Sequence, residues 1–281
     1  SSTSRGLGDV YKRQVMVLLC LLWIYPIVLI LLNSLKKEGT FTTSTVFQLP
    51  TKETFAGLSN YVYGVTKMGF LSSLGYSLLI TITSVFLILL CCSMTGWYLT
   101  RVNNKLSKFM NLLIVFSMVV PFQMVMFTLS KTADRLNLNN PWNICIIYLG
   151  FGAGLAVFMF TGFMKSVPME IEEAAMIDGC GPFRILTSII IPMCKPGIVT
   201  VCMISAMAAW NEYPVALVMV TDPTKATLPV GLANLYEIQR YATDWGALFA
   251  ALVLALIPTV ILFIVGQKQL VQGLSVGGVK G

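Results

Sequence analysis

The chain consists of long apolar runs separated by shorter polar connectors. A run of about 20 successive apolar residues is long enough to cross the hydrocarbon core of a bilayer as an α-helix. The pattern therefore predicts an all-α integral membrane protein with six transmembrane helices. The expected spans are Val15–Leu35, Leu71–Thr100, Phe109–Ser130, Trp142–Met164, Gly197–Val220 and Trp245–Gly266.

Prolines and glycines modify three of these runs. Pro121 lies within the third run and Pro214 within the fifth. Because proline lacks the amide donor of the helical ladder, we expect neither helix to be straight. The fourth run contains Gly150 and Gly154, a small-residue pair typical of closely packed transmembrane helices.

The composition agrees with a membrane protein. Of 281 residues, 56% are hydrophobic and 11% charged, with a mean hydropathy of +0.80, whereas globular domains carry about a quarter charged residues. So little charge excludes a soluble enzyme, a disordered protein and a nucleic-acid-binding protein. The short connector that contains Arg101, Lys105 and Lys108 has no acidic residue. The positive-inside rule places this connector in the cytoplasm and, with six spans, both chain termini as well.

The chain contains no histidine. Serine and cysteine nucleophiles therefore lack an imidazole base, and histidine-ligated metal sites are excluded. The stretch Gly273–Gly277 matches G-x-S-x-G, but without a strand context or a histidine it does not indicate a hydrolase. The seven cysteines include no C-x-x-C pair, so we predict small buried hydrophobic residues rather than disulfides or metal ligands. Neither a catalytic residue nor a metal site is predicted.

The first fourteen residues differ from the rest of the chain. Ser1–Gln14 is polar, and its last six residues read DVYKRQ, which looks like a translated adapter from sequencing-library preparation. We therefore interpret residues 1–14 as a non-native scar or a truncated start, and residues 15–281 as one membrane domain. The alternative is a native amphipathic leader.

The most informative connector is Ser166–Gly197, between the fourth and fifth spans. Its first half predicts a short helix, because Pro168 suits a helix start and three glutamates follow it, near the positive end of the helix dipole. Gly179 and Gly181 are typical stop signals. A second, apolar helix is expected to begin near residue 182 and to end near residue 192, at a proline.

Small residues on the first of these helices permit the close approach of another backbone. Such a helix suits docking into a groove of a second protein. The alternative is an interfacial helix that lies on the membrane surface. Composition alone leaves both alternatives open.

The same connector resembles the signature of the permease subunits of bacterial ATP-binding cassette (ABC) importers: E-A-A, three residues, G, nine residues, then I-x-L-P. Ile191 replaces the usual leucine. The flanking residues, including Pro168 and Asp178, and the tail Gly266–Gly281 look like the carbohydrate branch, represented by the inner-membrane subunit of maltose-type transporters. The matching signature positions are Glu173, Ala174, Ala175, Gly179, Ile189 and Pro192.

The resemblance implies a non-enzymatic subunit that moves a sugar into the cytoplasm. The chain has no G-x-x-x-x-G-K-[ST] phosphate loop, so ATP must bind to a partner and the chain needs no cofactor of its own. The implied assembly contains this chain, a second homologous permease, two ATP-binding subunits and an extracytoplasmic sugar-binding protein, within the lipid of a bacterial inner membrane. In this family the glutamate-rich connector is the coupling helix, seated in a groove of the ATPase. The implied coupling residues are Glu170, Glu173, Ala174, Ala175, Asp178 and Gly179.

Candidate residues for the substrate pathway lie in the fifth and third spans. Glu212 is about 15 residues from the cytoplasmic start of the fifth span, and so roughly 22 Å along a helix. An ionisable residue at that depth is costly unless it faces a partner or a watery cavity. Asn211 and Tyr213 flank it, and Gln123 follows the proline of the third span. The alternative is a structural hydrogen bond to another span or to the second permease.

Two other function classes remain open. A self-contained secondary transporter would use Glu212 as an ion or proton site and would need no ATPase. A membrane scaffold would leave Asn211 and Glu212 without a purpose. Within the importer interpretation, glycerol phosphate esters or polyols form the second substrate class.

Overall fold

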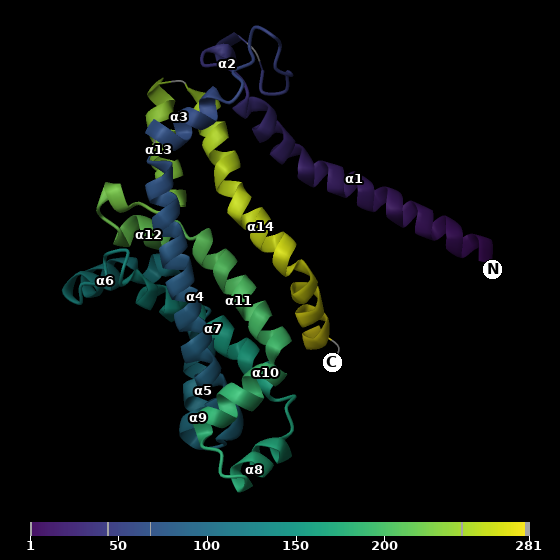
Figure 1. Ribbon diagram of the computed structural model, residues 1–281, viewed down its shortest axis with the longest axis vertical. Helices are drawn as coiled ribbons and strands as arrows, with labels where there is room; N and C mark the ends of the chain where they lie inside the picture. The colour runs from purple at the N-terminus through teal and green to yellow at the C-terminus, as the bar shows by residue number, and fades with distance from the viewer. Residues whose placement is uncertain (1, 44, 68, 243, 279–281) are drawn as a thin grey trace. The chain divides into compact units, whose positions relative to one another are not determined.

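The computed structural model describes residues 2–43, 45–67, 69–242 and 244–278. Regular structure in these ranges is helical, apart from an isolated antiparallel bridge between Lys36 and Phe55. The predicted all-α class is therefore confirmed. The chain divides into two compact units, which are described separately (Figure 1). Unit 1 comprises the chain up to Leu71 together with Gly231–Ile257, and unit 2 comprises Ser72–Val230 and the chain from Pro258.

The apolar runs form helices long enough to cross a membrane. Four single helices among the described residues have this length and hydropathy, and two further pairs qualify if each pair is one bent span. The first pair, Lys105–Ser117 and Phe122–Arg135, is bent by 105°. The second pair, Pro182–Met193 and Lys195–Trp210, is bent by 84°. The chain is thus a multi-pass membrane protein with four to six spans. The four single helices are α1 (Ser2–Ser34), α4 (Phe70–Arg101), α7 (Ile144–Met164) and α14 (Trp245–Gly278).

Both predicted interruptions occur at proline. Pro121 is the N-cap of α6 (Phe122–Arg135), which follows α5 (Lys105–Ser117) after the 105° bend. In the fifth run, α11 (Lys195–Trp210) ends before α12 (Pro214–Met219) begins at its proline. A proline in the first turn of a helix loses no hydrogen bond, because the amides there have no partner within the helix.

Two ends of the apolar runs differ from the predicted boundaries. Helix α1 already begins at Ser2, so the stretch that was interpreted as a scar or a leader is helical from that residue on. Helix α14 continues past Gly266 to Gly278. Straight-chain residues such as Lys12, Gln14, Gln267 and Lys268 are good helix formers and continue each helix beyond its apolar run.

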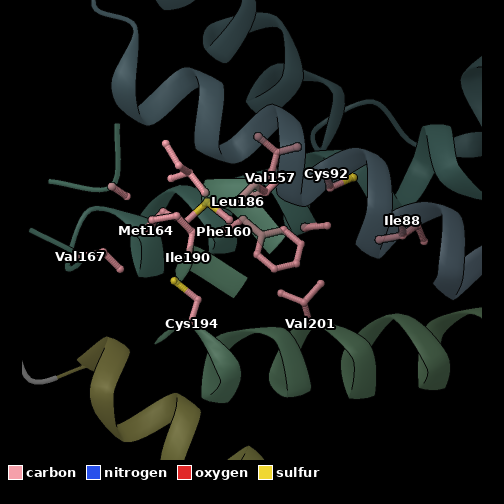
Figure 2. Close-up of a cluster of buried hydrophobic side chains, with 13 residues drawn as sticks. Ile88, Cys92, Val157, Phe160, Met164, Val167, Leu186, Ile190, Cys194 and Val201 are labelled. Atoms are coloured by element: carbon pink, nitrogen blue, oxygen red, sulfur yellow. The ribbon is translucent and has the colours of Figure 1, made fainter. Parts of the chain in front are cut away.

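The hydrophobic core of unit 2 centres on Phe160, whose side chain is fully buried (Figure 2). Val201 of α11 and Cys92 of α4 point toward the same cluster (Figure 2). The second half of the connector after α7 completes the cluster, and it runs to residue 193, close to the predicted end. This half comprises α9 (Pro182–Ile185), the π-helix η1 (Leu186–Ile190) and α10 (Ile191–Met193).

Close packing at the fourth span is confirmed for one of its two glycines. A methyl group added at Gly154 would meet Met118 and Ser117 of the preceding hairpin, so only glycine permits this contact. Gly150 has open space around it. The cysteines are free thiols, and the burial prediction is wrong for Cys20, which is exposed because its whole stretch of α1 has no neighbour in the described structure.

Unit 1 contains helices within connectors for which no helix was predicted. Asn60 of α3 donates from its Nδ2 to the carbonyl oxygens of Ser34 and Lys36, at 2.8 Å each, and so holds the end of α1. A small apolar cluster joins Leu235 to Leu248. The remaining short elements are α2 (Thr40–Thr43), α3 (Ser59–Lys67), the 3-10 helix η2 (Pro223–Lys225) in unit 2, and α13 (Leu228–Ala242).

The basic connector between α4 and α5 gives a prediction for stability. The Asn104 side chain accepts a hydrogen bond from the Ser107 amide at 2.7 Å and caps α5. We expect Asn104→Ala to lower the free energy of unfolding by about 1 kcal/mol. Thermal unfolding in detergent checks this, with Asn104→Ser, which keeps a capping oxygen, as the matched control. Equal melting temperatures for both variants would contradict the prediction.

Candidate functional site

The glutamate-rich connector forms α8 (Met169–Ile177), a short helix at the end of unit 2 next to α9 (Figure 1). Pro168 is its N-cap. Gly179 has φ +81°, its amide donates to the Met176 carbonyl at 3.0 Å, and the Cys180 amide donates to the Ala175 carbonyl at 2.9 Å. These paired bonds are a Schellman motif, in which the left-handed position favours glycine. The predicted helix and its glycine stop are both present.

Most of α8 is solvent-exposed in this chain. Of the predicted coupling residues, Glu170, Glu173, Ala174, Asp178 and Gly179 are exposed. Apolar side chains on the same helix are also exposed, including 86% of Ile177. Such an apolar surface flanked by carboxylates is typical of a docking element. The sixth predicted residue, Ala175, differs: it is 7% exposed and packs into the core of unit 2.

Glu172 is the buried glutamate of the helix. Its side chain is 3% exposed and forms a salt bridge with Arg101 of α4. From the sequence, Glu172 is predicted only as one of the charges in the first turn of the helix, and its buried ion pair is not predicted. The available signal was Arg101, a cation that directly follows a long uncharged run and is therefore well placed to pair with an acid near the membrane surface.

A cavity of about 170 Å³ lies within unit 2, with walls from α4, α7, α11 and the start of α12. Its lining is largely apolar, with polar groups from Tyr148, Ser205 and Glu212. Tyr148 is 6% exposed, and its hydroxyl has no hydrogen-bond partner in the described structure. A buried hydroxyl without a partner costs free energy.

Only one of the four predicted pathway residues lines this cavity. Glu212 does so, and its Oε1 accepts a hydrogen bond from the Val215 amide at 2.9 Å. Asn211 is exposed and donates from Nδ2 to the carbonyl of Met207 at 2.8 Å. Tyr213 and Gln123 are exposed and are not among the lining residues. The structure therefore places Glu212 and Tyr148 in the lining of one cavity, and Tyr148 was not predicted from the sequence.

The cavity can bind a hydroxyl-rich molecule with an apolar face. The Tyr148 hydroxyl can donate and accept, and the Glu212 carboxylate accepts. The ring of Phe151 is also part of the lining and offers a flat apolar surface. Hydrogen-bonding groups beside an aromatic ring suit the alternating polar and apolar surface of a polyhydroxylated ring.

The connector after α12 carries an exposed ion pair. Lys225 Nζ lies 2.8 Å from Asp222 Oδ2, and Asp222 Oδ1 accepts from the Thr224 amide at 3.0 Å. Hydrogen bonds from Lys225 and Thr224 lower the pKa of Asp222 to about 2. Because this pKa lies below its ordinary value, the pair weakens only as the pH falls from about 4 toward 2. It is intact at neutral pH.

Known proteins match nearly the whole chain. It is 33% identical over 264 residues to the probable starch degradation products transport system permease protein AmyC of Thermoanaerobacterium thermosulfurigenes, with 94% of both chains covered. It is 31% identical to the melibiose/raffinose/stachyose import permease protein MelC of Bacillus subtilis (strain 168), with 91% of both covered.

A solved structure shows the same fold. This is the crystal structure of a bacterial ABC transporter involved in the import of the acidic polysaccharide alginate, with a TM-score of 0.80 and 24% identity. The match covers 95% of this chain and 98% of that chain. Residues 92–276, which include α8 and most of the cavity, match a family described as binding-protein-dependent transport system inner membrane component. The chain belongs to this family of binding-protein-dependent inner membrane transport components.

Proposed function

We propose that this chain is the permease subunit of an ATP-driven importer for carbohydrates, and that it receives its substrate from an extracytoplasmic binding protein. The observation that carries the proposal is α8, an exposed acidic and apolar helix that ends in a left-handed glycine at the signature spacing. Relatives named for starch degradation products and for melibiose, raffinose and stachyose support carbohydrate as the substrate class. The subunit itself is non-catalytic.

In this proposal α8 is the coupling helix and docks into a groove of the ATP-binding subunit. The exposed carboxylates of Glu170 and Glu173 meet cations of that subunit, and exposed apolar residues such as Ile177 fill the groove. An interfacial helix on the membrane surface is less favoured, because acidic groups are repelled by anionic lipid headgroups.

We further propose six spans with both termini in the cytoplasm. The four long helices are then four spans, and each of the two bent helix pairs contributes one more. The basic connector with Lys105 and Lys108 lies on the cytoplasmic side. A second homologous permease and two ATP-binding subunits complete the assembly, with ATP bound by the latter.

The cavity with Tyr148 and Glu212 is the proposed substrate site of this subunit. We expect Tyr148→Phe to lower the transport rate about fivefold, because one hydrogen bond of about 1 kcal/mol to the substrate is lost. Stability should be unchanged or slightly higher, since the removed hydroxyl has no partner in the described structure. Uptake by proteoliposomes and thermal unfolding test the two parts. A stability loss with normal uptake would contradict the prediction.

The proposed function is tested by reconstituting this chain in lipid with its candidate partner permease, ATP-binding subunits and binding protein. We expect the binding protein loaded with an oligosaccharide to stimulate ATP hydrolysis and uptake. Stimulation by a polyol or a glycerol phosphate ester instead would change the substrate class. Uptake by this chain alone, driven by an ion gradient, would replace the proposal with a secondary transporter that uses Glu212.

A further inference from the structure

Helix α8 is joined to the rest of unit 2 through few side chains. Of its nine residues, only Glu172 and Ala175 are buried. Ala175 contributes a methyl group to the apolar core. The polar part of the attachment therefore depends on Glu172.

The Glu172 carboxylate is fully engaged by α4. Its Oε2 accepts a hydrogen bond from Trp97 Nε1 at 3.0 Å, and its Oε1 accepts from Arg101 Nε at 2.7 Å. Arg101 and Glu172 also form a salt bridge, with side chains 14% and 3% exposed. Both oxygens and the charge of the carboxylate are thus satisfied away from solvent.

The same arginine also binds the end of α7. Arg101 Nη2 donates to the Val167 carbonyl at 3.0 Å and to the Met164 carbonyl at 3.3 Å. Carbonyl groups at a helix C-terminus carry partial negative charge and are favourable partners for a cation. One guanidinium therefore joins α8, the end of α4 and the end of α7.

These two helices also line the cavity. Ile88 of α4 and Tyr148 of α7 are both lining residues. The three-way junction of Arg101 thus connects the exposed helix α8 to two walls of the cavity within one compact unit. Separating the buried charges would leave each of them uncompensated, so α8 and both helix ends are held together when α8 is displaced.

We infer that Arg101 and Glu172 are positioning residues that transmit displacement of α8 to the cavity walls, with Trp97 aligning the carboxylate. The inference rests on the proposed function, because it assigns α8 as the ATPase-docking helix. It adds the internal connection through which a movement of the docked helix α8 is passed to the helices that line the substrate cavity. The ATP-binding subunit meets the exposed face, whereas this junction lies on the buried face.

The test measures, in the reconstituted complete transporter, the factor by which loaded binding protein stimulates ATP hydrolysis per assembled complex. We expect Glu172→Gln to reduce this factor at least tenfold while ATP-binding subunits still co-purify with the chain. Glu53→Gln, the same change at an exposed carboxylate, is the matched control and should leave the factor unchanged. The double variant R101Q/E172Q also removes the junction but leaves no unpaired charge, so we expect the factor to stay at least tenfold reduced; recovery of stimulation would assign the loss in Glu172→Gln to the uncompensated charge and would overturn the inference.

A purely structural role predicts a different pattern. Fewer complexes would then assemble, but each would be stimulated normally, and that result would overturn the inference. If Glu172→Gln does not assemble, Trp97→Phe removes one hydrogen bond without a charge, and we expect it to reduce the factor about threefold; an unchanged factor would again overturn the inference. Absence of stimulation in the unmodified transporter would instead refute the proposed function itself.

Discussion

Replacing Gly179 by aspartate is expected to abolish binding-protein-stimulated transport while the chain still inserts in the membrane. The residue has φ +81°, so any side chain there costs about 1–2 kcal/mol of backbone strain. Apart from the two adjacent residues, no atom of the described residues lies within 4 Å of the position that a Cβ would take. The fold therefore tolerates the side chain, and the main effect falls on a partner that approaches this surface. Uptake and ATP hydrolysis in proteoliposomes measure the loss of transport, and membrane fractionation measures insertion.

A matched pair of alanine variants separates strain from docking. Gly181 is also exposed with open space around it, but its φ is −71°. Gly181→Ala should therefore be neutral, whereas Gly179→Ala should lower thermal stability slightly and stimulation several-fold. If the Gly179→Asp variant shows normal substrate-stimulated ATP hydrolysis, the assignment of α8 as the coupling helix is wrong.

Replacing Glu212 by glutamine is expected to slow transport by a factor of about 10 to 100. The carboxylate lines the cavity with Tyr148, and a hydrogen bond to a charged group contributes about 1.5–3 kcal/mol. Glutamine retains an oxygen that can accept from the Val215 amide, so the start of α12 is preserved. The measurement is the initial rate of uptake at saturating loaded binding protein.

Asn211→Ala is the matched control for this prediction. Asn211 precedes Glu212 but is exposed, and its amide bonds the Met207 carbonyl rather than facing the cavity. Its replacement should change uptake less than twofold. Equal losses for the two variants would indicate that the break between α11 and α12 matters as a whole, and that the carboxylate has no separate role.

Local signals predicted the helices well. The break at Pro121, the separation of α11 from α12 before Pro214 and the short helix ended by Gly179 all depend on residues within a few positions of the feature. Helix α13 was not predicted, because its sequence is only weakly apolar and lies in a connector. Its Leu235 is buried by packing with Leu248, a tertiary contact that no local pattern indicates.

The site was less predictable for the same reason. Glu172 and Arg101 are separated by 71 residues, and although the position of Arg101 after an uncharged run suggests an acidic partner, nothing in the sequence identifies Glu172 as that partner. Tyr148 appears in the sequence as one aromatic residue in an apolar run, and only the packing of α4, α7 and α11 makes it part of a cavity. Conversely, Asn211 and Tyr213 were selected for their proximity to Glu212 in sequence, but the end of α11 at Trp210 turns them away from the cavity lining.

The pairing of Arg101 with Glu172 has a consequence for biosynthesis. Arg101 leaves the ribosome 71 residues before its partner, so it is an uncompensated cation while α4 is being inserted. In the proposed topology it adds, at that stage, to the positive charge of Lys105 and Lys108 that would retain the connector in the cytoplasm. Once Glu172 has been synthesised, the same cation is neutralised within the folded chain. In the proposed topology one arginine would thus serve first as a topology signal and later as an internal structural link.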